Sequence, residues 1–159
     1  MSTRRRVALR QLLRGAAVGA SILVAWGAAP ADAELDAARA RWRASGLTAY
    51  EYGYRKYCEC HRDSPPETIV SVRDGDVFRV RHRPAGSATE VPAADKNFDY
   101  YWTIDGLFRL LATARERGAQ VRATYDATLG YPRELYIDYD SSYIGDELDI
   151  RLTAVTPLP

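Results

Sequence analysis

Tyrosine recurs at every second position in one stretch of the chain, at Tyr50, Tyr52 and Tyr54, just before the segment 58–61 (Cys-Glu-Cys-His). Successive side chains of a β-strand point to opposite faces, so this spacing places the three rings on one face. Tyrosine suits a half-buried face, where the ring is covered and the hydroxyl reaches a polar partner. We therefore predict a strand over residues 48–57, which the remaining segments must cover or flank.

Two helices are indicated by apolar residues at helical spacing. Over residues 34–45, three apolar side chains share one face: Leu35, Ala38 and Trp42. The second helix begins at Thr103, a residue type that caps helix N-termini, and runs to Arg117, before Gly118. Its apolar stripe is the clearest in the chain: Ile104, Leu107, Phe108, Leu111 and Ala114. We expect both stripes to be core.

Further strands are predicted where apolar residues alternate. Asp74-Gly75 is a two-residue hairpin signal between strands at 68–72 and 77–82. The buried face of this hairpin is expected to hold Val70, Val72, Phe78 and Val80. Residues 83–99 show little periodicity and read as a long surface loop, and three more strands follow at 120–125, 133–139 and 147–155. The order α-β-β-β-α-β-β-β predicts an α+β domain, a single antiparallel β-sheet with two helices packed on one face.

The first 33 residues have the pattern of a cleavable signal peptide. Five arginines precede an uncharged, weakly apolar run at 16–29, and Ala31-Asp32-Ala33 gives the small-x-small pattern of a cleavage site. The apolar run is shorter than the about 20 residues of a membrane-spanning helix. The arginines at 4–6 also fit a twin-arginine signal, so the export route stays open. We expect cleavage to leave one domain, residues 34–159, that is periplasmic or secreted and has no membrane span.

Cleavage would also change the charge of the domain. The chain has 22 basic and 21 acidic residues, and loss of five arginines and one aspartate leaves 17 and 20, a net charge of −3. A mildly acidic domain does not favour nucleic acid, which selects clustered Lys and Arg. The one basic run, Arg79-Val80-Arg81-His82-Arg83, alternates like the outer face of a strand, and we expect it to be solvated.

Cys58 and Cys60 are the only cysteines of the chain. In an exported protein such a pair usually forms a disulfide, here a small and strained ring that would stabilise the fold little. Three alternatives stay open. The pair could be redox-active, because strained bridges are easily reduced. It could bind zinc together with His61 and His82, although Cys-x-Cys is not the usual spacing. The thiols could also stay free or pair between molecules.

Tyr100, Tyr101 and Trp102 stand together just before the second helix. Tyrosine and tryptophan are enriched at recognition surfaces because they cover much area with few rotatable bonds. We therefore predict a partly exposed aromatic patch that contributes to binding. The alternative is that the three rings close one end of the core.

Asp126, Gly130 and Pro132 have the pattern of a structural turn, in which the aspartate accepts backbone N–H groups and Gly130 adopts a positive φ. The alternative is a cation site further along, from five acidic residues: Asp138, Asp140, Asp146, Glu147 and Asp149. Their spacing lacks the calcium-loop pattern, and a solvated strand face explains them more simply. No metal and no cofactor are expected.

Enzyme signatures such as Gly-x-Ser-x-Gly, a phosphate-binding glycine loop or His-Glu-x-x-His do not occur in the sequence. We therefore expect a non-catalytic binding or interaction module rather than an enzyme. Its partner would be a protein or small molecule of the cell envelope. The competing hypothesis is a thiol–disulfide or metal-handling role at Cys58 and Cys60.

The sequence also resembles a family of short exported bacterial proteins grouped as a domain of unknown function. The matching residues are Leu35, Ala38, Trp42, Tyr50, Tyr52, Cys58, Cys60, Val70, Val72, Asp74, Gly75, Leu107, Phe108, Tyr125, Asp126, Gly130, Tyr131, Pro132 and Asp138. The resemblance covers the whole predicted mature chain. It implies export and one α+β domain, and it assigns no activity and no catalytic residues.

Overall fold

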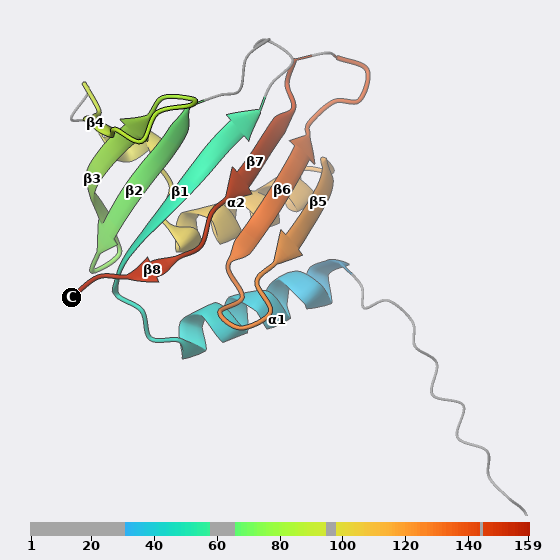
Figure 1. Cartoon of the computed structure of the whole chain (residues 1–159). Coiled ribbons are helices and arrows are strands. Elements are labelled where there is room, and N and C mark those ends of the chain that lie inside the picture. Colours follow the sequence, from blue (N-terminus) through green and yellow to red (C-terminus); the bar gives the residue numbers. More distant parts are fainter. Residues whose placement is uncertain (1–30, 58–65, 95–97, 144) are drawn as a thin grey trace, which may run out of the picture.

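The computed structural model describes residues 31–57, 66–94, 98–143 and 145–159 (Figure 1). The elements, in chain order, are α1 (Ala31–Ala44), β1 (Ala49–Tyr57), β2 (Glu67–Arg73), β3 (Asp76–Arg83), β4 (Val91–Pro92), the 3₁₀ turn η1 (Phe98–Tyr100), α2 (Ile104–Glu116), β5 (Gln120–Tyr125), β6 (Pro132–Asp138), β7 (Leu148–Leu152) and β8 (Thr156–Pro157). No helix among these residues is long and apolar enough to span a membrane.

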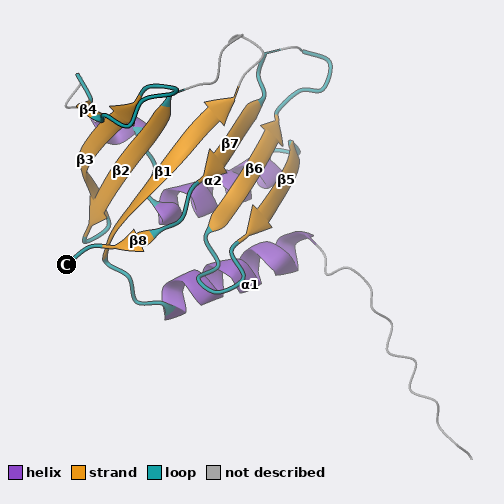
Figure 2. Ribbon diagram, viewed as in Figure 1, coloured by secondary structure: helices purple, strands orange, loops and turns teal. Residues whose placement is uncertain are grey.

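The described strands form one antiparallel sheet in the order β4-β3-β2-β1-β7-β6-β5. The long strand β1 lies at its centre, where β2 pairs along one side and β7 and β8 share the other. In Figure 2, α2 lies behind the sheet and α1 lies beneath its lower end. The predicted α+β fold, with one antiparallel sheet and two helices, is confirmed.

The tyrosine face of β1 is the centre of the core. Tyr50, Tyr52 and Tyr54 are 3%, 1% and 8% exposed, and the hydroxyls of Tyr50 and Tyr52 reach polar partners as expected. The Tyr50 hydroxyl accepts a hydrogen bond from the backbone N–H of Ile104 at 3.0 Å. The Tyr52 hydroxyl donates to the backbone carbonyl of Trp102. The two tyrosines therefore fix the start of α2 over the sheet.

Both helices use the predicted apolar faces. In α2, the Thr103 hydroxyl caps the helix by accepting from the Gly106 N–H at 3.0 Å, and the whole predicted stripe is buried. In α1, Trp42 packs edge-on against Tyr50 with ring centroids 5.0 Å apart. Its indole N–H donates to Asp105 of α2 at 3.3 Å, so Trp42 joins both helices to the sheet.

The β2–β3 hairpin differs from its prediction at one residue. Asp74 and Gly75 both adopt positive φ, as a tight hairpin turn requires. However, Val72 pairs with Val77 and Ser71 pairs with Arg79, so Phe78 is an extra residue in a β-bulge. The expectation that Phe78 is buried is wrong: its side chain is 39% exposed, with the guanidinium of Arg73 4.9 Å from the ring centroid.

The predicted last strand, 147–155, is interrupted. After β7, Thr153 leaves the regular ladder and bonds Gly53 with both backbone and side chain, and pairing with β1 resumes only in β8. The interruption shifts the alternation by one residue. Val155 is therefore buried, while Ala154, which the alternation predicted on the apolar face, is exposed. Likewise, the predicted surface loop 83–99 contains the short strand β4 and the turn η1.

Candidate functional site

The face of the sheet opposite the helices carries charged side chains in register. Because Tyr50, Tyr52 and Tyr54 face the helices, the alternate residues of β1 face the other way. These are Glu51, Gly53 and Arg55, followed across β2 and β3 by Glu67, Ile69, Ser71, Arg79, Arg81 and Arg83. We call this helix-free side the open face.

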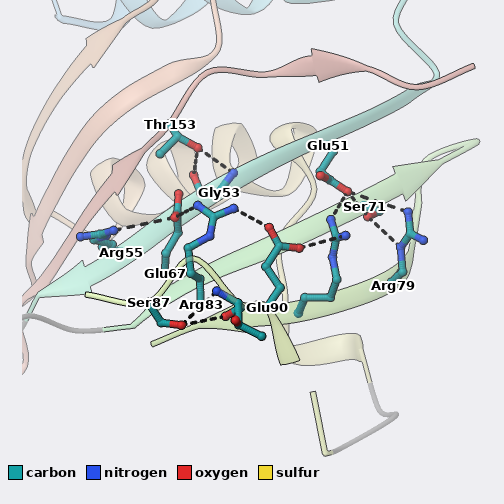
Figure 3. A network of polar contacts seen from close by, with 12 residues as sticks. Glu51, Gly53, Arg55, Glu67, Ser71, Arg79, Arg83, Ser87, Glu90 and Thr153 are labelled. Carbon is teal, nitrogen blue, oxygen red and sulfur yellow. Dashed lines mark hydrogen bonds and ion pairs between the residues drawn. The ribbon is translucent and has the colours of Figure 1, made fainter. Parts of the chain in front are cut away.

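Three glutamates and the arginines of β3 form a chain of ion pairs on the open face (Figure 3). Glu51 accepts from the Ser71 hydroxyl at 2.7 Å and from Arg81 Nη2 at 2.5 Å. The other side of Arg81 lies 3.0 Å from Glu90, in the loop just before β4. Glu90 also accepts from Arg83, so it bridges two arginines and ties β4 to the sheet.

The chain of ion pairs ends at Glu67, which is only 5% exposed. Arg83 donates to Glu67 Oε2 at 2.5 Å, and Arg55 lies 3.7 Å from the same oxygen. The hydrogen bond to Glu90 is the main cause that raises the pKa of Arg83 above its ordinary value. Arg81 and Arg83 are therefore each held in a fixed position by two carboxylates, one on either side.

A hollow of about 290 Å³ opens beside this network, over the middle of β1. Its lining includes Glu51, Gly53, Glu67, Thr153 and Thr156. Two features create the space: Gly53 has no side chain, and the chain leaves the ladder after β7. A Cβ at Gly53 would overlap Glu67 Oε1 and stand 2.7 Å from Thr153 Oγ1, so Gly53 is what allows the carboxylate to lie over the strand.

The other half of the open face has a different character. Arg122 of β5 stacks on Tyr136 with its guanidinium carbon 4.4 Å from the ring centroid, and Arg151 of β7 lies 4.8 Å from that of Tyr57. A hollow of about 330 Å³ lies between β5, β6 and β7. Arg151 also pairs with Asp149 at 3.6 Å, on the same strand. Among the described residues of this half, no carboxylate bridges two strands as Glu51, Glu67 and Glu90 do in the β1–β3 half.

Cys58, Cys60 and His61 lie outside the described residues, so their disulfide, redox and metal hypotheses stay predictions. His82, the fourth residue of the zinc hypothesis, has its Nδ1 3.3 Å from the Thr68 hydroxyl. The described residues contain no group of three His, Cys, Asp or Glu side chains placed to hold a metal ion.

The predicted aromatic patch lies at the entry to α2, where Tyr100 ends η1. Tyr101 and Trp102 are half-buried. The Trp102 ring is 6.1 Å from Tyr54, and that of Tyr101 is 6.3 Å from Phe98. Both rings thus pack on the core while keeping an exposed part. Whether they bind a partner stays a prediction.

Asp126 lies in the turn between β5 and β6. Its Oδ1 accepts from the N–H groups of Thr128 at 3.0 Å and Leu129 at 2.7 Å. Gly130 has φ +83°, and the buried Pro132 begins β6. These are the contacts of a structural turn, and the turn packs against the backbone of α1.

The five acidic residues of the cation hypothesis do not converge on one point in the structure, and those with hydrogen bonds make them to residues nearby in the chain. Asp140 accepts from the hydroxyl and N–H of Ser142, which lowers the pKa of Asp140, and Glu147 accepts from the Gly145 N–H at 2.8 Å. Among the described residues, Asp138 and Asp146 each have one buried oxygen without a hydrogen-bond partner. Both side chains are only half-buried, and the structure does not join them into a site.

Sequence reasoning missed the central residues of the open face. The run 79–83 was expected to be solvated, but Arg81 and Arg83 are paired with Glu51, Glu67 and Glu90. The alternation of the arginines indicated the face correctly. Their carboxylate partners are 7 to 30 residues away in the chain, and only the strand register brings them together.

Comparison with known proteins gives one match. A family model described as a family of unknown function (DUF6174) matches residues 34–157. No curated protein and no solved structure matches the chain.

Proposed function

The chain belongs to the family of unknown function DUF6174, and from this premise we propose that it is an exported, non-catalytic binding module that takes its partner on the open face of the sheet. The observation that carries the proposal is the ordered network of Glu51, Arg81, Glu90, Arg83 and Glu67 beside a hollow at the centre of that face.

Binding costs conformational entropy when long side chains must be ordered. On the open face, the conformational entropy of the long arginine side chains has already been lost on folding, because each arginine of the network contacts a carboxylate on two sides. Exposed ion pairs contribute little to stability, and the attraction in a buried pair such as Arg83–Glu67 is offset by the cost of desolvation, so stability is a weak reason for such an arrangement. A preorganised polar surface with a central hollow suits the recognition of a protein or small molecule in the cell envelope.

Site-specific photo-crosslinking in the producing cells tests where the partner binds. The photoreactive residue p-benzoylphenylalanine is placed at Phe78 and at Thr124, which lie at opposite ends of the open face and are exposed. The matched controls are Arg43 on α1 and Glu116 on α2, which are exposed on the helices. Native mass spectrometry of the gently purified protein detects a small ligand in parallel.

We expect adducts from the open-face positions, or a bound small molecule, and no adducts from the helix positions. Adducts confined to the helices would overturn the proposal. So would the absence of both an adduct and a bound molecule.

Export is the second part of the proposal. The match to the family model begins at residue 34, the first residue after the proposed cleavage site, which supports a domain that begins there. N-terminal sequencing of the protein from the extracytoplasmic fraction should find Glu34 first. An intact Met1 in a cytoplasmic fraction would refute this part.

A further inference from the structure

We infer that β5 is the contact surface for a second copy of this chain, and that two β5 strands pair antiparallel to join two sheets into one. The inference goes beyond the proposed function, because it concerns the edge of the sheet and names no ligand. It depends on an edge strand without a neighbour, on charges that suit self-pairing, and on apolar side chains that the monomer leaves half-covered.

The strand β5 forms a long edge of the described sheet. It has six residues, pairs with β6 on one side and has no described strand beyond it (Figure 2). The opposite edge is protected, because β4 has only two residues and ends in Pro92, and the rest of β3 carries the bulge at Phe78. Short strands, proline and bulges prevent edge-to-edge pairing. In β5 the one bulge lies at the end, between Thr124 and Tyr125.

The single charged residue of β5 leaves the edge open. Arg122 lies back over β6, with its guanidinium carbon 4.4 Å from the centre of the Tyr136 ring. Gln120, Arg122 and Thr124 are exposed, so a strand of another molecule can reach β5. The backbone N–H and C=O groups that point away from β6 have no described strand to bond, and a second strand would pair them.

The charge of Arg122 selects one register for self-pairing. Two identical antiparallel strands are related by a two-fold axis, so one residue lies opposite its own copy. The longest pairings of β5 are centred on Arg122, over residues 120–124, or on Ala123, over residues 121–125. The first would bring two arginines directly opposite each other, which is destabilising. The second places Arg122 opposite Thr124 of the second copy, and this is the register we expect.

The register centred on Ala123 also brings opposite charges together. Thr124 lies opposite Glu134 of its own β6, so Arg122 of the second copy would stand two strands from Glu134, about 10 Å away. The two long side chains can meet over the short threonine if Arg122 turns from Tyr136. Glu134 is exposed, and no ion pair of Glu134 or Arg122 occurs within the described ranges. Such charges select a register more than they supply affinity.

The affinity would come from the backbone pairing and from the helix side of the strand. Val121, Ala123 and Tyr125 pack against the core but are only half-buried. In the expected register, Ala123 lies beside its own copy and Val121 lies beside Tyr125 of the second copy. Pairing would therefore cover apolar surface that the monomer leaves at its edge. Because the contact is one strand wide, we expect a weak dimer, with a Kd on the order of 100 µM.

Sedimentation equilibrium of the mature protein, residues 34–159, tests the association. Between about 10 µM and about 1 mM it should show a monomer–dimer equilibrium. Hydrogen exchange measured by NMR at the two ends of this range locates the contact. At high concentration, exchange should become slower at the amides of β5 and stay unchanged at Val91 and Ala93, on the opposite edge.

Variants of an exposed residue test the register without disturbing the core. Thr124→Arg places like charges opposite Arg122 of the second copy at two symmetric positions, so it should weaken the dimer about tenfold or more. Thr124→Glu places opposite charges there and should tighten the dimer severalfold. The same two changes at Thr48, an exposed threonine before β1, are the matched controls and should leave the Kd unchanged.

A chain that stays monomeric up to about 1 mM would overturn the inference, as would a dimer that responds alike to Thr124→Arg and Thr124→Glu. Slower exchange at β5 only when a different protein is added would assign the edge to another partner and equally refute self-pairing. A photo-crosslink from Thr124 to a second copy of the chain would support it. Phe78, at the other end of the sheet, reports on the proposed function, so the two ideas can fail separately.

Discussion

Gly53 stands in the middle of a central strand, where glycine normally weakens a sheet because it has no side chain to pack. Here its Cα hydrogens leave room for the carboxylate of Glu67 above β1 and for the hydroxyl of Thr153 beside it. The absence of a side chain at residue 53 therefore has two structural consequences, which any larger residue would prevent. It shapes the hollow, and it lets Thr153 complete the ladder where β7 ends.

Gly53→Ala should destabilise the fold by about 1–3 kcal/mol, the usual cost of inserting a methyl group into a packed site. The added Cβ would overlap Glu67 Oε1 and push the carboxylate away from its two arginines. Urea unfolding measures the loss. Gly106→Ala in α2 is the control, since its Cβ would meet nothing closer than 3.4 Å, and it should cost nothing. Equal stability of the two variants would show that the close approach at Gly53 is not tight.

The buried tyrosines predict loss of stability at alkaline pH. Burial raises the pKa of Tyr50 and of Tyr54 to about 12 and that of Tyr52 well above its ordinary value of 10.0. As pH rises above 10, the unfolded chain loses these protons first. The contribution of the tyrosines is therefore complete below pH 10 and is lost between about pH 10 and 12, at about 1.4 kcal/mol per pH unit for each residue.

Urea unfolding at several pH values, together with tyrosinate absorbance, checks the alkaline prediction. The native protein should show hydroxyls that ionise later than any in the urea-unfolded protein, and Tyr50→Phe should remove one of them. Stability that stays constant from pH 10 to 12 would contradict the burial of these hydroxyls.

At the scale of elements, the turn between β5 and β6 and the helix α1 fit together through Gly130. Its φ is +83°, and a Cβ would overlap the carbonyl oxygen of Ala38 and stand 2.9 Å from Arg41 Cβ. The absence of a side chain lets the turn lie directly on the helix backbone. This contact, together with Trp42, decides where α1 sits under the sheet.

Gly130→Ala should cost about 3 kcal/mol or more, because backbone strain and a clash with main-chain atoms of α1 add together. The matched variant is Gly118→Ala, where φ is +80° but a Cβ would meet nothing within 4 Å. It should show only the strain, about 1–2 kcal/mol. Thermal and urea unfolding of both variants separate the two effects, and equal losses would mean that the turn does not press on α1.

We predict that Glu90 anchors β4 to the rest of the sheet. This short strand is joined to β3 by the pairing of Val91 and Pro92 and by the Ala93 N–H, which donates to Val80 O at 3.1 Å. Glu90→Gln removes the charge that bridges Arg81 and Arg83, so β4 should open more often. Hydrogen exchange at the Ala93 amide should become faster, and added salt should have the same effect on the parent protein. Glu116→Gln should leave that exchange unchanged; slower or equal exchange in Glu90→Gln would disprove the anchoring role.

At the scale of the whole molecule, α1 begins at Ala31, three residues before the proposed cleavage site. Cleavage would remove its first three residues and the contact of Asp32 with Arg115 at 3.4 Å, in which Asp32 is 84% exposed. The three residues that anchor the helix remain: Leu35, Ala38 and Trp42. The fold should therefore tolerate the cut.

Chains of residues 31–159 and 34–159 should differ in unfolding free energy by about 1 kcal/mol or less, since an exposed ion pair contributes no more than that. A chain of residues 46–159, which lacks α1, is the control and should fail to fold stably, because losing one buried tryptophan alone costs about 3–5 kcal/mol. A large difference between the two longer chains would place the true domain start before Glu34.

Local pattern alone predicted the periodic parts of this protein. The structure confirms the tyrosine face of β1, the N-cap and apolar stripe of α2 and the Asp74-Gly75 turn. These features could be predicted because strand alternation, helical spacing and turn chemistry depend on neighbours a few residues away. The charged character of the open face could be anticipated in part from the alternating arginines of β3. The segment 58–61, which ends the most informative stretch of the sequence, lies outside the described residues.

Only the tertiary structure decided where the alternation fails and which charges meet. The bulge that exposes Phe78 and the interruption at Thr153 follow from how strands pair, not from the residues within one strand. Glu51 finds Arg81 across 30 positions, and Glu67 finds Arg83 across 16, through the register of β1, β2 and β3. The candidate site depends on these pairings, because a hollow and an ion-pair network form only where distant strands bring their side chains to the same place.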